Sequence, residues 1–124
     1  TQKAAVTALT SDLRPTMEMV EEFRKRRTRV LEIVKDIPGL ICPEPEGAFY
    51  VFPDVSSYYG KSDGETIINN AGDFSMYLLN KAHVSSVMGD AFGEPKCVRF
   101  SFANSMKNIE EGWRRIKEAL SQLR

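Results

Sequence analysis

The chain has 124 residues, of which 17 are basic and 17 acidic, so its formal net charge at pH 7 is zero. One domain of this length buries roughly two thirds of its unfolded surface and can form a core without disulfide bonds or structural metal ions. The balanced charge argues against nucleic acid and membrane surfaces as partners, and no apolar run approaches the ~20 residues that cross a bilayer. One histidine and two cysteines leave little from which to build a zinc site.

The two cysteines, Cys42 and Cys97, are far apart in the sequence and form no CxxC motif. We expect two free thiols in a reducing compartment, with a disulfide between them as the alternative. This cysteine usage, together with the lack of a membrane-spanning run, predicts a cytoplasmic location. The sequence assigns neither cysteine a role.

The chain begins with two predicted helices. Residues 1–9 have a helical pattern that no capping residue precedes, so we expect residues 1–13 to be the end of a helix cut from a longer chain. A longer helix is predicted over residues 14–37, with Pro15 in its first turn and helix breakers at 37–39. Its apolar positions are Met17, Val20, Phe23, Val30, Leu31 and Val34.

Residues 24–29 of the long helix form a basic run, Arg-Lys-Arg-Arg-Thr-Arg. As a linear string the run resembles a nucleic-acid patch. On a helix its charges spread around the cylinder, and Glu21 with Lys25 and Glu22 with Arg26 have the spacing of favourable pairs. We therefore interpret it as a solvated helix face, with nucleic-acid binding as the weaker alternative.

The middle of the chain predicts short strands at 40–42, 48–52 and 84–88, the second being rich in residues that favour strands. Residues 55–65 are predicted to be a surface loop. A helix is predicted over residues 74–83. Gly72 or Asp73 is the expected cap of this helix, and residues 66–70 are expected to form a turn of helix before it.

The stretch from Lys96 to Ala103 alternates as a strand does, with Val98, Phe100 and Phe102 on one face. Arg99 falls on the opposite face, with Ser101. A guanidinium is always charged and its donor fork matches a carboxylate at two points, so one interpretation is an anion receptor. The alternatives are an arginine on a solvated face or one paired with an acidic residue elsewhere.

The last helix is the clearest in the chain. Asn108 is the expected N-cap, with Glu111 three residues on as in a capping box. Its apolar stripe consists of Ile109, Trp113, Ile116, Leu120 and Leu123. The order of elements predicts an α+β sandwich in which helices pack on one face of a small mixed or antiparallel sheet.

Three phrases in this order, Pro45–Pro53, Met88–Gly93 and Val98–Ala103, followed by the helix from Asn108, resemble the C-terminal part of class I and II aminotransferases. These are pyridoxal-phosphate enzymes of fold type I, and the likeness is strongest to bacterial aspartate aminotransferases. The resemblance implies that residues 14–124 are the small domain of a two-domain, homodimeric enzyme of amino-acid metabolism.

The resemblance also implies that Arg99 binds the α-carboxylate of the substrate, an amino acid such as aspartate or glutamate, or a 2-oxo acid. Gly47, Phe49 and Ser101 are implied to line the cleft. The family's cofactor lysine has no counterpart here, and Lys107 is expected to be a surface residue. The cofactor and the catalytic groups are therefore expected on a large domain of the same polypeptide, and the fragment alone is expected to be inactive and free of cofactor.

A hypothesis from another class stays open at this point. The chain has no evident nucleophile, base or cofactor lysine, which also suits a stand-alone α+β module. Such a module would bind a carboxylate or a peptide, or mediate association, without catalysis.

Overall fold

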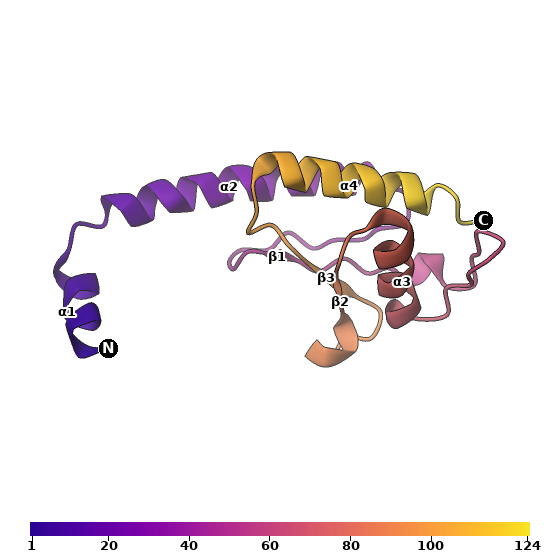
Figure 1. Ribbon diagram of the computed structural model, residues 1–124, viewed down its shortest axis with the longest axis horizontal. Helices are drawn as coiled ribbons and strands as arrows, with labels where there is room; N and C mark the ends of the chain where they lie inside the picture. Colours follow the sequence, from indigo (N-terminus) through magenta and orange to yellow (C-terminus); the bar gives the residue numbers. More distant parts are fainter.

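The computed structural model describes all 124 residues. Two long helices, α2 and α4, lie side by side over a small sheet, and α3 lies near the C-terminal end of α4 (Figure 1). The helices are α1 (Gln2–Thr10), α2 (Arg14–Lys35), α3 (Ala71–Tyr77) and α4 (Met106–Leu120). The strands are β1 (Tyr50–Val51), β2 (Val87–Met88) and β3 (Val98–Ser101). Short helical turns are η1 (Ser56–Tyr58), η2 (Leu78–Ala82) and η3 (Gly89–Phe92).

The sheet is antiparallel, with β3 in the centre and β1 and β2 at its edges. The α+β class and the helix-covered sheet predicted from the sequence are thus confirmed. Val98, Phe100 and Phe102 are all buried on the face toward the helices. The ring of Phe100 lies 4.9 Å from that of Trp113, and every member of the predicted α4 stripe is buried. The alternation in β3 therefore fixes which face joins the core.

The N-terminal arm, consisting of α1 and the first half of α2, projects away from this core (Figure 1). Of the predicted α2 stripe, only Val30, Leu31 and Val34 are buried, whereas Met17 is 58% exposed. The period of the stripe was predicted correctly, but of its first half only Phe23 packs against the core. Leu9 of α1 is likewise 87% exposed.

The strands are shorter than predicted. The run 48–52 pairs only at Tyr50 and Val51, because Ala48 adopts a left-handed backbone with φ of 57° and Pro53 lacks a donor. The prediction of a strand at 40–42 is wrong, since only an isolated bridge joins Ile41 to Asp54.

Two predicted helix caps are wrong. The side chain of Asn70, not of Gly72 or Asp73, caps α3 by accepting a hydrogen bond from the amide of Asp73 at 2.8 Å. Residues 66–70 are correspondingly not helical. Ser105, not Asn108, caps α4, because its hydroxyl accepts from the Asn108 amide at 3.2 Å.

The charges of α2 pair along its surface, but not in the predicted partnerships. Glu21 binds Arg24 and Glu22 binds Lys25, both three residues apart rather than four. Arg29 reaches across to Glu110 of α4 at 2.8 Å. The basic run is therefore largely neutralised by acidic neighbours, which supports the interpretation of a solvated helix face.

Cys42 and Cys97 are both free thiols, as expected. Burial raises the pKa of each thiol above its ordinary value, which keeps it in the less reactive protonated form. None of the helices combines the length and the apolar character that a membrane-crossing segment requires.

His83 ends η2 in a left-handed conformation, with φ of 55°. A residue with a Cβ is destabilised by about 1–2 kcal/mol in this conformation. Glycine avoids this steric cost but loses more chain entropy on folding, so the net gain is smaller. We expect His83→Gly to raise the free energy of unfolding by about 0.5–1 kcal/mol, measured by urea titration of Trp113 fluorescence. His83→Ala is the control and should give no gain. A lower midpoint for His83→Gly would show that the imidazole makes a compensating contact.

Candidate substrate-carboxylate site

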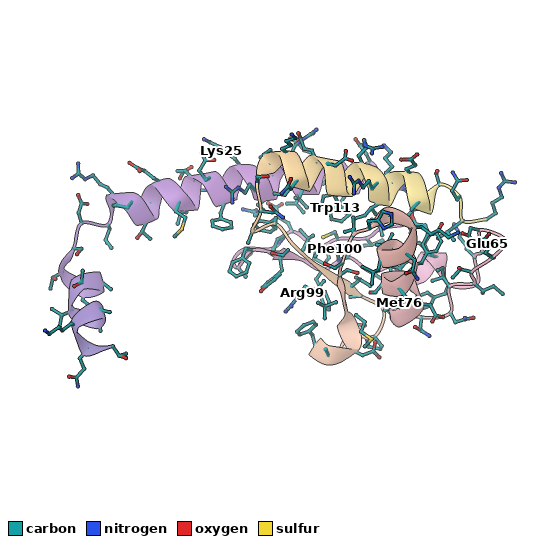
Figure 2. All side chains as sticks on the ribbon, in the orientation of Figure 1. Lys25, Glu65, Met76, Arg99, Phe100 and Trp113 are labelled. Carbon is teal, nitrogen blue, oxygen red and sulfur yellow. The ribbon has the colours of Figure 1, made fainter.

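Arg99 lies in the central strand, on the face of the sheet opposite the helices. Figure 2 shows its side chain pointing away from α4, whereas the neighbouring Phe100 lies on the side of Trp113. The strand alternation causes this, because β3 must turn its apolar positions toward the core. Arg99 is half-buried.

Two aromatic rings hold the Arg99 guanidinium. Its central carbon lies 4.3 Å from the ring centroid of Tyr50 and 4.3 Å from that of Phe92. Tyr50 belongs to β1, and Phe92 belongs to the η3 turn that follows β2, so the rings come from opposite sides of β3. Such cation–π contacts attract an arginine without using its N–H donors. We call Tyr50, Phe92 and Arg99 the Arg99 cluster.

The guanidinium of Arg99 has no ion-pair or hydrogen-bond partner within the chain, and none of its nitrogens is buried. Other arginines are ion-paired, namely Arg14, Arg24, Arg27, Arg29, Arg114 and Arg115. The sequence left open that Arg99 pairs with an acidic residue elsewhere in the chain. The structure excludes this alternative. The result is a positive charge held in place by rings, with its planar donor fork free for a carboxylate.

The η3 turn is fixed by close backbone contacts at Gly89. The Gly89 amide donates to the carbonyl of Cys97 at 2.8 Å, and the Gly89 carbonyl accepts from the amide of Glu94 at 3.1 Å. A Cβ atom on residue 89 would lie 2.0 Å from the Glu94 oxygen. Only glycine allows the backbone to come this close at residue 89. The resulting turn places the Phe92 ring against Arg99.

The other cleft residues expected from the sequence lie at different places. Ser101 shares the face of Arg99, being opposite Tyr50 in the register of β1 and β3. Phe49 contacts Phe23 of α2, with ring centroids 6.0 Å apart, and is 41% exposed. Gly47 is exposed and no atom lies within 4 Å of the position that a Cβ would take.

Sequence reasoning did not assign a contact with Arg99 to Tyr50 or Phe92. Both are aromatic residues within the phrases that carry the resemblance, which is the one signal that could have selected them. Their meeting at Arg99 depends on strand register and on the η3 turn, neither of which the sequence pattern specifies. No group of three or more histidine, cysteine or acidic side chains is arranged to hold a metal ion.

Comparison with known proteins places the chain in a family. The sequence profile described as "Aminotransferase class I and II" matches residues 1–116. The bifunctional aspartate aminotransferase and glutamate/aspartate-prephenate aminotransferase of Petunia hybrida is 46% identical over 125 residues, covering 96% of this chain and 26% of that protein. The aspartate aminotransferase of Streptomyces avermitilis is 37% identical, covering 95% of this chain and 29% of that protein.

Solved structures agree. The aspartate aminotransferase of Rhizobium meliloti superposes with a TM-score of 0.94 at 38% identity, covering 99% of this chain and 31% of that one. The alanine aminotransferase of Pyrococcus furiosus gives 0.84 at 28% identity, covering 95% and 28%. The chain belongs to the class I and II aminotransferase family, and it spans less than a third of the length of these relatives.

Proposed function

We propose that this chain is the substrate-clamping small domain, over residues 14–124, of an aminotransferase that moves an amino group between aspartate or glutamate and a 2-oxo acid. Residues 1–13 would be the end of the helix that joins it to a large domain. The observation that carries the proposal is the unpaired guanidinium of Arg99, held between Tyr50 and Phe92. Membership of an enzyme family does not favour the stand-alone binding module.

In this role Arg99 binds the α-carboxylate of the substrate at two points. A planar fork that is held on its faces cannot rotate freely, so the carboxylate it binds has a defined orientation. This is positioning rather than chemistry, and it fixes the Cα–H bond relative to groups outside this chain. Ser101 on the same face, with Gly47 and Phe49 at the hairpin before β1, would line the cleft around it.

Pyridoxal phosphate is the cofactor that the family implies for the full-length enzyme. When bound, it withdraws electrons from the substrate carbon, and its aldehyde requires a lysine amine. The residues of this chain do not fit it, because no lysine joins the Arg99 cluster and Lys107 is exposed at the start of α4. The cofactor site is therefore proposed to lie on the large domain, in a cytoplasmic homodimer.

The proposed amino-acid preference rests on the activities for which the relatives are named. The relatives from Streptomyces avermitilis and Rhizobium meliloti are aspartate aminotransferases, yet an alanine enzyme and an aromatic aminotransferase of Pyrococcus horikoshii share the fold. Every such substrate carries an α-carboxylate, whereas the side chains differ. Arg99 is accordingly assigned to the common group.

The test is an amino-transfer assay of the full-length protein with pyridoxal phosphate, aspartate and 2-oxoglutarate, following the glutamate that forms from 2-oxoglutarate. We expect turnover with the full-length protein and none with the 124-residue chain. Alanine and phenylalanine as amino donors serve as the comparison for preference. A full-length protein that loads cofactor but transfers no amino group from any of the three would overturn the proposal.

A further inference from the structure

We propose that two side chains of α2, Phe23 and Arg27, are positioning residues for Arg99, acting through the loop that carries Tyr50. The inference rests on the proposed function only for its consequence in catalysis. Its structural content is that α2 determines the orientation of the Arg99 guanidinium.

The loop between Cys42 and β1 needs support from outside itself. Residues 43–48 make no backbone–backbone hydrogen bond as donor or acceptor. Ala48 adopts a left-handed backbone with φ of 57°, a conformation that residues other than glycine rarely keep without surrounding constraint. The backbone is joined to the sheet again only where the Phe102 amide donates to the Phe49 carbonyl at 2.9 Å.

The first support is an ion pair between Arg27 and Glu44. Arg27 lies where a charge interrupts the apolar stripe of α2, and only 28% of its side chain is exposed. Its Nε atom is buried without a partner, so the side chain is partly desolvated where it meets Glu44. A partly exposed pair of this kind adds little to stability, but it favours one position of Glu44, and hence of the loop, over others.

The second support is a series of aromatic contacts that runs from α2 to Arg99. The Phe23 ring lies 6.3 Å from the buried Phe102 ring and 6.0 Å from the Phe49 ring. Phe49 lies 4.6 Å from Tyr50, whose ring centroid is 4.3 Å from the guanidinium carbon of Arg99. Aromatic pairs at these separations prefer defined relative angles, so a displaced Phe23 displaces Tyr50.

The two supports lie one helical turn apart, on the same side of α2. They grip the loop near both of its ends, at Glu44 and at Phe49. The loop runs below α2 toward the sheet (Figure 1). The orientation of Tyr50 is thus set jointly by its strand pairing and by α2.

The test is the NMR signal of the Arg99 Nε–H group in the 15N-labelled 124-residue chain. The nearby rings of Tyr50 and Phe92 shift this proton, so its position reports how they stack. We expect Phe23→Leu and Arg27→Met each to move it toward the position of an unstacked arginine. The matched control is Arg24→Met, an exposed residue of the same helix paired with Glu21, which should leave it in place.

Two further variants separate positioning from loss of packing. Phe23→Tyr keeps the ring, and exchanging the pair as Arg27→Glu with Glu44→Arg keeps the contact, so both should restore the Arg99 signal. In a Tyr50→Leu background, Phe23→Leu should have no further effect. An Arg99 signal that stays in place in Arg27→Met and Phe23→Leu, with the backbone spectrum intact, overturns the proposal. If Phe23→Leu does not fold, the Arg99 signal in Arg27→Met and in Glu44→Gln is the test. A signal that stays in place in both variants overturns the proposal.

The full-length enzyme distinguishes this inference from the proposed function. If both hold, Arg27→Met raises KM for the amino acid several-fold while kcat changes less. If the NMR signal moves but KM does not, the positioning stands and the carboxylate role of Arg99 fails.

Discussion

Arg99→Ala in the full-length protein is expected to lower kcat/KM for aspartate by roughly 30- to 5,000-fold. Truncating one partner of a desolvated charge pair costs about 2–5 kcal/mol, and each 1.36 kcal/mol is tenfold in rate. Arg99→Lys should recover part of the loss, because an ammonium keeps the charge but lacks the planar fork. Steady-state kinetics with varied aspartate provide the measurement.

The control is Arg114→Ala, which removes an arginine already engaged by Glu111 and Glu118 on the exposed side of α4. Its kinetics should match those of the parent protein. A substrate amine without a carboxylate adds a second control, since the penalty of Arg99→Ala should nearly vanish for it. Ordinary kinetics for Arg99→Ala with aspartate would remove the residue from the carboxylate site.

The sequence predicted the orientation of Arg99 because that orientation is a local property. Alternation along β3 places Val98, Phe100 and Phe102 together, and their burial then forces Arg99 to the other face. What surrounds the guanidinium is a long-range property. Tyr50 contacts the guanidinium because of the register of β1 with β3, and no residue of either strand predicts that register.

The helix predictions show a similar division. A stripe of apolar residues gives the phase of a helix but not its first residue, so the predicted cap of α4, Asn108, lies three residues after the observed cap, Ser105. The stripe of α2 was likewise correct in phase, yet Met17 is exposed. Periodicity identifies the apolar side of a helix, but it does not predict which surface that side packs against.

The second large effect that we expect is on stability, from a substitution in the η3 turn. Gly89→Ala should lower the free energy of unfolding by about 2–4 kcal/mol, the sum of steric overpacking and a weakened backbone hydrogen bond. The new Cβ would lie 2.0 Å from the Glu94 carbonyl oxygen and 2.5 Å from that of Cys97, and both are backbone atoms that cannot rotate aside. Urea unfolding followed by Trp113 fluorescence measures the loss.

Gly47→Ala is the matched control, because a Cβ at that glycine meets no atom within 4 Å and should change stability by less than about 0.5 kcal/mol. Equal midpoints for the two variants would mean that the turn relaxes without cost. If Gly89→Ala is destabilised as expected, the Arg99 Nε–H signal should move as well, since the turn that must shift carries Phe92. Gly89 would then serve the binding site through the geometry of its backbone, with no side chain of its own.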